Sequence, residues 1–224
     1  MKTILVVGGS KGIGKAIVNK LISSHNIIMF SRSASENDDI IHYPINVLED
    51  ELPVLDNLDG LVYCPGSINL KPFTRLTLED FQKDFEINVL GAVKVIKKYQ
   101  KSFSNKKGSV VLFSTVATQM GMPFHASIAV SKAGVEGLTK SLAAEYATKI
   151  RFNAIAPTVT NTSLASRLLR NEKQKESMAE RHPLKMYLEA EEVASLANYL
   201  LSDDSKAISG QVFPIDAGIT TLKL

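Results

Sequence analysis

The chain has 224 residues, of which 45% are hydrophobic and 22% charged, an ordinary composition for a soluble globular protein. This length suits one domain over residues 1–224 whose core needs neither disulfides nor a structural metal, and the single cysteine, Cys64, fits a reducing cytoplasm. The net charge of +3 is too small to indicate nucleic-acid binding, and no run of about 20 apolar residues is present to span a membrane.

Short apolar runs alternate with amphipathic stretches along the chain. We expect buried strands at residues 3–7, 26–30, 60–63, 109–113 and 151–155, which are aliphatic or β-branched and bounded by Gly, Ser or Asn. Apolar residues at helical spacing occupy residues 13–21, 81–96, 135–146 and 193–200. This alternation predicts an α/β fold of three layers, a doubly wound parallel sheet with helices on both faces.

One of these helices has a clear start. Thr77 can cap it, with Glu79 and Asp80 in the first turn, where acidic side chains complement the helix dipole. The buried face of this helix is expected to carry Phe81, Phe85, Val89 and Ile96.

The segment GGSKGIG, residues 8–14, lies where the first strand meets the first helix. A dinucleotide's pyrophosphate binds at such a junction, because glycines allow a tight turn and the backbone N–H groups and positive helix end point at the phosphates. Residues 9–16 also nearly match the P-loop of nucleoside triphosphatases. The last position, however, is Ala16, which has no hydroxyl to bind Mg²⁺, so we interpret the turn as a dinucleotide site.

The residues after the second strand favour NADP over NAD. A carboxylate there would bind the 2′-hydroxyl of NAD and repel a 2′-phosphate, but the first carboxylate is Glu36. Arg32 and Lys11 are cations, and Ser31 and Ser33 add hydroxyls, all of which suit a phosphate. NADP is therefore the preferred cofactor, and NAD is the alternative. Under the alternative, Arg32 faces solvent and binds no phosphate.

Residues 158–187 form a long segment without strand character. The segment is charged, yet its apolar side chains include Leu164, Leu168, Leu169, Met178 and Met186. Segments of this length in a compact domain are usually functional, so we expect a lid on the substrate side, the alternative being surface helices with no role in binding. Its apolar side chains indicate an apolar small-molecule substrate.

Six motifs in register resemble those of the short-chain dehydrogenases/reductases, over essentially the whole chain. They are the glycine turn, Tyr63-Cys64-Pro65-Gly66, Ile87-Asn88-Val89, Ser131-Lys132-Ala133-Gly134, residues 151–157 and residues 208–218. The resemblance implies a Rossmann fold, a nicotinamide dinucleotide cofactor, and a site of Asn, Ser, Tyr and Lys where a carbonyl receives a hydride and a proton. It also implies a homodimer or homotetramer formed through helices near residues 77–101 and 131–147.

The resemblance assigns Asn88, Thr115 and Lys132 as catalytic residues. In family members the tyrosine gives the proton, the lysine binds the nicotinamide ribose and lowers the tyrosine's pKa, the serine holds the substrate oxygen, and the asparagine supports a proton relay. Thr115 keeps the hydroxyl of the serine. Ile128, however, stands at the tyrosine position and can neither donate a proton nor form a hydrogen bond. Since a general acid contributes about 10²–10⁴-fold, efficient reduction by the usual route is not expected.

Three explanations of Ile128 remain open. Another acid, such as His125 or Tyr187, replaces the tyrosine in an oxidoreductase. Alternatively, the protein binds the cofactor with little or no turnover and acts as a regulator, subunit or scaffold. The third explanation is that the isoleucine is an engineered replacement.

The glycine turn and the resemblance together define the residues expected to contact the cofactor. They are Gly8, Ser10, Lys11, Gly12, Ile13, Gly14, Ser31, Arg32, Asn46, Val47, Cys64, Pro65, Gly66, Asn88, Lys132, Pro157, Thr160 and Thr162. We expect no metal-binding residues, and we expect neither nucleic acid nor a membrane as a partner.

Overall fold

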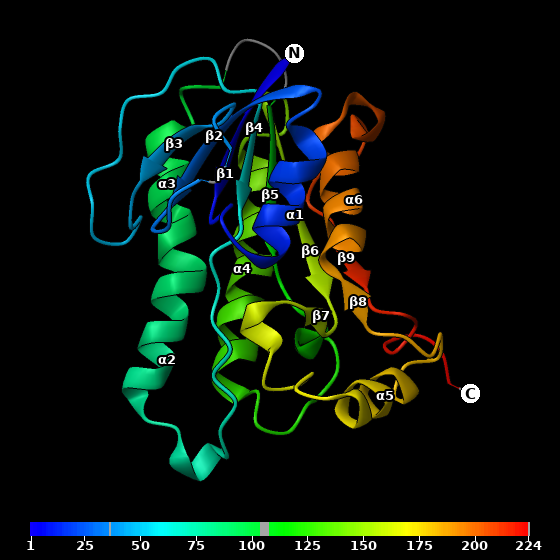
Figure 1. Ribbon diagram of the computed structural model, residues 1–224. Helices are drawn as coiled ribbons and strands as arrows, with labels where there is room; N and C mark the ends of the chain where they lie inside the picture. Colours follow the sequence, from blue (N-terminus) through cyan, green and yellow to red (C-terminus); the bar gives the residue numbers. More distant parts are fainter. Residues whose placement is uncertain (36, 104–107, 224) are drawn as a thin grey trace.

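The computed structural model describes residues 1–35, 37–103 and 108–223, so Glu36 lies outside the described residues. Seven parallel strands of this part of the chain form one sheet in the order β3-β2-β1-β4-β5-β6-β9 (Figure 1). The strands are β1 (Lys2–Val7), β2 (His25–Ser31), β3 (Ile41–Pro44), β4 (Gly60–Tyr63), β5 (Gly108–Phe113), β6 (Ile150–Pro157) and β9 (Val212–Ile215), with a separate parallel pair β7 (Thr160–Asn161) and β8 (Leu188–Glu189).

The helices connect consecutive strands and lie on both faces of the sheet. They are α1 (Gly12–Leu21), α2 (Leu78–Phe85), α3 (Gly91–Tyr99), α4 (Ala126–Glu145), α5 (Glu172–Glu180) and α6 (Ala190–Leu201). Short 3₁₀ turns are η1 (Phe73–Arg75), η3 (Val116–Thr118), η4 (Ser163–Ala165) and η5 (Asp203–Ser205), and a π-turn, η2 (Glu86–Leu90), joins α2 to α3. The predicted three-layer α/β architecture is confirmed. No helix in the described part of the chain is long and apolar enough to cross a membrane.

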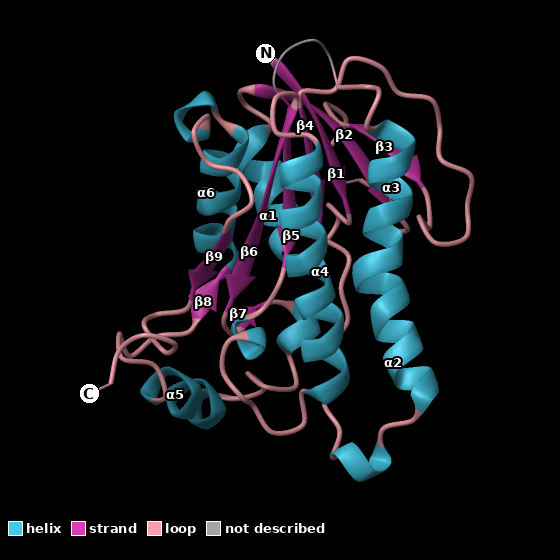
Figure 2. Cartoon of the chain, turned by 180° about the vertical axis from the view of Figure 1, so that it is seen from behind, coloured by secondary structure: helices cyan, strands magenta, loops and turns pink. Residues whose placement is uncertain are grey.

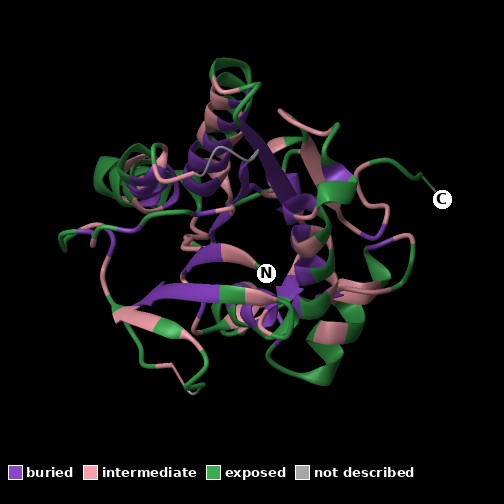
Figure 3. Ribbon diagram, turned by 90° about the horizontal axis from the view of Figure 1, so that it is seen from above, coloured by how far each residue is buried: buried purple, intermediate pink, exposed green. Residues whose placement is uncertain are grey.

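Each strand divides its side chains between two apolar cores. On β1, Leu5 and Val7 point toward α3 and α4, whereas Ile4 and Val6 point toward α1 and α6. Figure 2 shows α3 and α4 in front of the sheet, Figure 1 shows α1 and α6 on the other side, and in Figure 3 the strands between them are buried. Strands covered on both faces are apolar throughout, which is why they read as continuous hydrophobic runs.

The five predicted strands lie within β1, β2, β4, β5 and β6. Strand β3 was not predicted, because an edge strand of four residues with mostly half-buried or exposed side chains carries little periodic signal. No helix connects β3 to β4. Instead, Val47, Leu52 and Leu55 of this connection pack into the core beside α3, and the Tyr99 hydroxyl donates to Pro53 O (2.8 Å).

The π-turn changes which face of α2 is buried. Thr77 caps α2 as predicted, and a capping box with Asp80 completes the cap. Phe85, however, is 39% exposed, while its neighbour Asp84 is only 3% exposed. The expected position of Phe85 on the buried face was therefore wrong. A π-turn holds one more residue than an α-turn, and the buried positions before it shift back by one residue.

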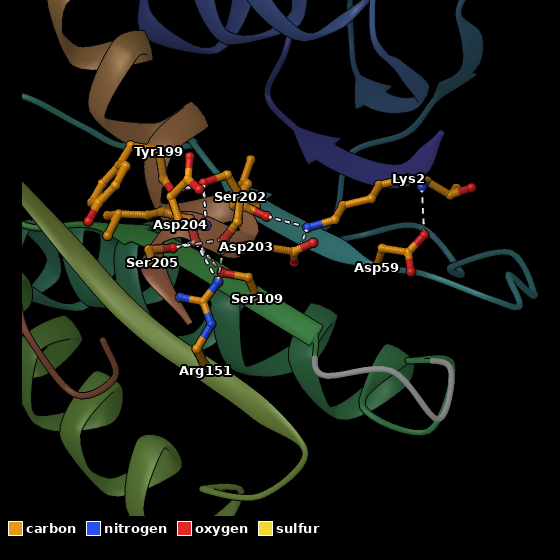
Figure 4. Close-up of polar contacts among 12 residues, drawn as sticks. Lys2, Asp59, Ser109, Arg151, Tyr199, Ser202, Asp203, Asp204 and Ser205 are labelled. Carbon is orange, nitrogen blue, oxygen red and sulfur yellow. Dashed lines mark hydrogen bonds and ion pairs between the residues drawn. The ribbon is translucent and has the colours of Figure 1, made fainter. Parts of the chain in front are cut away.

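The amino ends of the strands are joined to the C-terminus of α6. Arg151 on β6 and Ser109 on β5 both donate to Leu200 O, over 2.9 and 2.7 Å, and Lys2 on β1 donates to Leu201 O over 3.1 Å (Figure 4). These donors satisfy carbonyls that a helix end otherwise leaves unpaired, and the positive charges of Arg151 and Lys2 complement the helix dipole. This end of the sheet is closed by structural contacts, so the carboxyl ends of the strands are left for a binding site.

The first helix starts in close contact with the end of β1. A Cβ atom added to Gly14 would lie 2.2 Å from the carbonyl oxygen of Gly8, a distance that no side chain tolerates. The contact lets α1 begin directly beside the glycine turn, with its N-terminus aimed across the carboxyl ends of the strands.

We predict that Gly14→Ala lowers the free energy of unfolding by about 1–3 kcal/mol or more, because the added methyl overlaps rigid backbone. Gly137→Ala is the matched control: Gly137 is exposed in the middle of α4, and a Cβ there meets nothing within 4 Å. That substitution should raise the free energy of unfolding by about 0.5–1 kcal/mol through helix propensity. Urea denaturation measures both changes, and similar effects at the two positions would contradict the close-contact argument.

Candidate active site

The glycine turn has the backbone conformation and open space that a phosphate needs. Gly8 (φ +79°) and Gly12 (φ +52°) adopt left-handed conformations that favour glycine. Lys11 precedes α1 without any side-chain hydrogen bond to its first turn, so no side chain caps the N–H groups at the helix start. Such groups, with the positive end of the helix dipole, bind an anion. The turn therefore fits the pyrophosphate of a dinucleotide.

Two other parts of the chain pack against this turn. A Cβ on Gly8 would lie 3.1 Å from Pro65, and a Cβ on Gly12 would lie 3.2 Å from Thr162. The segment after β4 and the segment after β6 are thus brought to the glycine turn, as expected where the carboxyl ends of parallel strands meet.

The main cavity, of about 290 Å³, opens at the carboxyl ends of β4, β5 and β6. Residues 158–187 form one wall, with Leu164, Leu168 and Met178 among its apolar side chains. Nine of the predicted site residues line it: Ile13, Cys64, Gly66, Thr115, Ile128, Lys132, Pro157, Thr160 and Thr162. The residues predicted to bind the cofactor and those predicted to contact the substrate therefore line one cavity.

A second cavity, of about 310 Å³, lies between the glycine turn and the end of β2. Ser10 and Lys11 line it, as do Ser33 and Ser35, whereas neither Ser31 nor Arg32 does. The exposed Arg32 side chain thus lies outside this cavity.

Three further predicted contacts are engaged elsewhere. The Ser31 hydroxyl is buried and donates to Ser33 O (2.7 Å), and Asn46 Oδ1 accepts from the Leu48 amide (3.2 Å). The Val47 side chain belongs to the core beside α3. Neither Asn46 nor Val47 lines either cavity.

Lys132 projects from α4 into the main cavity. Its Nζ donates to Phe113 O (2.8 Å), and burial lowers the pKa of this ammonium from its ordinary value to about 8, partly offset by attraction to Cys64 and Asp84. Burial also raises the pKa of the Cys64 thiol to about 12, which keeps it in the unreactive thiol form. Lys132 is therefore the ionisable group of this pair that can change charge near neutral pH.

Asn88 lies directly behind Gly66. A Cβ on Gly66 would lie 3.4 Å from Asn88 Oδ1 and 3.5 Å from Lys132 Nζ, so the two polar groups converge on this glycine. Asn88 Oδ1 is buried and is the one such side-chain atom without a hydrogen-bond partner among the described residues. Both distances are ordinary van der Waals contacts, so a methyl group would fit there, but glycine leaves the space beside these two groups open.

Ile128 lies in the cavity wall and is 5% exposed. Thr115 lines the same cavity, where its hydroxyl accepts a long hydrogen bond from the Ala117 amide (3.4 Å) and retains its own proton for a ligand. Of the two alternative acids, His125 lines the cavity and Tyr187 does not. His125 Nδ1 lies 2.8 Å from Pro123 O and donates to it, which leaves Nε2 as its other polar atom.

Sequence reasoning missed several polar residues around the cavity. His182 is 1% exposed, donates from Nδ1 to Met178 O (2.8 Å) and accepts from the Thr158 hydroxyl (2.8 Å). Ser67, which lines the cavity, donates to Asp84. The adjacency of Ser67 to Gly66 was a visible signal, whereas nothing in the spacing singles out Asp84, because the π-turn that places it inside is not evident from the sequence.

A comparison with protein-family models matches residues 45–220 to the family described as Enoyl-(Acyl carrier protein) reductase. A curated 3-oxoacyl-[acyl-carrier-protein] reductase from Rickettsia felis is 31% identical over 97% of this chain and 96% of its own length. The chain belongs to the short-chain dehydrogenase/reductase family. This family consists of oxidoreductases, and the match extends over nearly the whole of the chain.

Other relatives in the short-chain dehydrogenase/reductase family differ in the substrates and cofactors that they are named for. L-Xylulose reductase of Caenorhabditis elegans is 26% identical over 98% of this chain and 96% of its own length. The structure of ElxO with NADP bound has a TM-score of 0.84 and 26% identity, with 99% of each chain covered. 4-Hydroxyisoleucine dehydrogenase complexed with NADH has a TM-score of 0.87 and 25% identity, with both chains covered completely.

We predict that the buried Lys132 makes stability depend on pH. Between the lowered pKa of about 8 and the ordinary lysine pKa of 10.5, the folded Lys132 is neutral while the unfolded one is charged. The unfolded state then binds more protons, so the free energy of unfolding rises with pH. Between pH 7 and pH 10, the free energy of unfolding of the wild type should rise by on the order of 2–3 kcal/mol relative to that of Lys132→Met.

Urea denaturation at the two pH values measures this difference. Lys140→Met is the control, because Lys140 is exposed on the same helix. If the free energy of unfolding of the wild type, relative to that of Lys132→Met, falls as the pH rises, then burial does not lower the pKa of Lys132.

Proposed function

We propose that the protein is an NADP(H)-dependent oxidoreductase that interconverts a carbonyl group and an alcohol with a proton donor other than tyrosine. The observation that carries this proposal is the shared cavity of Thr115, Lys132 and Ile128 beside the glycine turn. The similarity to 3-oxoacyl-[acyl-carrier-protein] reductase of Rickettsia felis and L-xylulose reductase of Caenorhabditis elegans supports the reaction class.

The residues of the chain divide the binding task between them. The N-terminus of α1 would hold the pyrophosphate, and Lys132 would bind the hydroxyls of the nicotinamide ribose. The bound cofactor supplies or accepts the hydride. Thr115 would donate a hydrogen bond to the substrate oxygen, and the apolar side chains of residues 158–187 would exclude water around it. These apolar contacts support a substrate with an apolar part.

The lining of the second cavity supports NADP. Lys11 and Ser33 offer a charge and a hydroxyl, while the Ser35 hydroxyl donates to Asn37 O (3.0 Å). A 2′-phosphate would gain charge-assisted hydrogen bonds there, whereas none of the lining residues that the structure describes offers NAD a carboxylate for its 2′-hydroxyl.

The second candidate function is cofactor binding without turnover. It is favoured by the burial of Ile128, an apolar residue, at the position where relatives donate the proton. The protein would then act as a regulator, subunit or scaffold.

We also propose a homodimer or homotetramer. Leu78, Phe85 and Leu90 on the α2–η2 side and Val130 on the adjacent α4 are exposed apolar residues, which suits burial against a second copy. A cytoplasmic location stays a prediction.

We predict that Lys11→Glu lowers NADPH affinity about tenfold to a hundredfold, the effect of losing a hydrogen bond to a charged group. NADH affinity should change much less, because NADH lacks the 2′-phosphate. Cofactor fluorescence measures both dissociation constants. Arg32→Glu is the matched control, since Arg32 lies outside the second cavity. A larger NADPH loss in Arg32→Glu would place the phosphate on the Arg32 side instead.

We predict that the wild type oxidises NADPH with a carbonyl substrate. Because the wild type already has a proton donor, Ile128→Tyr should raise this rate by much less than the about 10²–10⁴-fold that a general acid contributes. The assay is NADPH absorbance with a panel of 3-oxoacyl thioesters, ketosugars and apolar ketones. Turnover in Ile128→Tyr alone would favour the binding-only function. If neither NADPH nor NADH binds, or if neither protein reduces any carbonyl, the proposed function is wrong.

A further inference from the structure

A buried carboxylate lies behind the wall of the main cavity. Asp84 is 3% exposed, and its two oxygens accept hydrogen bonds from Ser67 Oγ (2.6 Å) and Ser127 Oγ (2.5 Å). Taking a carboxylate out of water is costly unless hydrogen bonds compensate it, and apolar packing between α2 and α4 would not require one. An acid in this place is therefore a candidate for a chemical role.

The amide of Asn88 fixes the direction of the hydrogen bonds. Asn88 Nδ2 donates to the backbone oxygen of Asp84 (2.7 Å) and to Ser67 Oγ (3.0 Å). A carbonyl oxygen only accepts, so the nitrogen of the amide must face it. Ser67 therefore accepts from Asn88 and directs its own proton to Asp84 Oδ1, which leaves one lone pair on Ser67 Oγ.

The two serines differ in their access to the cavity. Ser67 lines it together with Thr115 and Ile128. Ser127 is 1% exposed, does not line the cavity, and precedes Ile128 on α4. Ser67 thus connects the cavity to the buried acid, while Ser127 holds the other oxygen of that acid from behind.

We propose that Ser67 and Asp84 form the proton relay that replaces the tyrosine: Ser67 is the catalytic residue that contacts the substrate oxygen, and Asp84 is the positioning residue that exchanges a proton with it. This inference rests on the proposed function and names its proton donor.

The transfers of protons and hydride through this relay balance in both directions of the reaction. In alcohol oxidation, the substrate O–H bond breaks and its proton passes to Ser67 Oγ, while the Ser67 proton passes to Asp84 Oδ1. The hydride leaves the substrate carbon for the oxidised nicotinamide, so the substrate becomes a carbonyl and Asp84 a neutral acid. Reduction is the reverse, and solvent restores the proton to Asp84 after each turnover.

The charged groups around Asp84 leave this route open. Lys132 on α4 is the cation that interacts electrostatically with Asp84, and its Nζ is directed to Phe113 O. The other charged residues near it on α2 are engaged on the outer side, where Lys83 pairs with Glu79 and Asp80 pairs with Lys71. Ser67 is the hydroxyl that joins this acid to the main cavity in the described chain.

The test compares four variants with the wild type, using the alcohol and carbonyl pair found in the NADPH assay. Asp84→Asn and Ser67→Ala should each lower kcat by about 10²-fold or more, because they remove a general base or its connecting hydroxyl. Ser67→Thr keeps the hydroxyl and should retain most of the activity. Ser127→Ala removes an equally short hydrogen bond to Asp84 outside the route, and its loss of kcat should be only a few-fold.

Two readouts separate the relay from a structural role. For alcohol oxidation, the pH profile of kcat should differ between the wild type and Asp84→Asn, because only the wild type has a carboxylate to accept the relayed proton. In the Ile128→Tyr background the tyrosine supplies the proton, so adding Asp84→Asn should change kcat only a few-fold. The melting temperature and the NADPH dissociation constant verify folding and cofactor binding in every variant.

A measurement without turnover completes the test. Infrared difference spectra of the protein recorded over a pH range should show a carboxyl band that is missing in Asp84→Asn and present in Ser127→Ala. The inference is overturned if that band is absent, if folded Asp84→Asn and Ser67→Ala retain wild-type kcat, or if Ser127→Ala loses as much as Ser67→Ala. It is also overturned if NADPH binds but only Ile128→Tyr turns over. The proposed function fails separately, through loss of cofactor binding or of all turnover.

Discussion

The contact between Gly14 and the carbonyl of Gly8 determines where α1 begins, and both cavities depend on that position. If α1 were displaced by the width of one methyl group, the N–H groups of its first turn would move away from the place where the segments that follow β1, β4 and β6 meet. Pro65 and Thr162 approach the turn within ordinary packing distance only because Gly8 and Gly12 carry no side chains. Backbone proximity, more than any polar side chain, therefore creates the anion-binding corner of the molecule.

Much of the fold was predictable because strands buried on both faces are apolar and because helices keep a regular period. The five predicted strands and the capped start of α2 follow from such local signals. Strand β3 and the helix-free connection after it do not, since their placement depends on packing against α3 rather than on a pattern of their own. The C-terminal strand β9 was expected only through the family resemblance.

The candidate site was predictable where a residue's role follows from its backbone or its motif. Thr115, Ile128 and Lys132 converge as the motif spacing indicates, and the glycine turn adopts the expected conformations. The residues that line the second cavity were harder to predict. Strand β2 ends at Ser31, so Ser33 lies in the bend after it, where strand alternation no longer fixes the side-chain direction. Sequence alone therefore did not tell whether Ser31 or Ser33 would line this cavity. The buried acid escaped prediction because its orientation depends on the π-turn.

That π-turn also sets the chemistry of the two sides of α2. One extra residue in a helical turn rotates everything before it by about 100°, so neighbouring side chains exchange the interior for the solvent. The interior of the molecule thereby gains a carboxylate at Asp84, and the outer side of α2 gains an aromatic ring at Phe85.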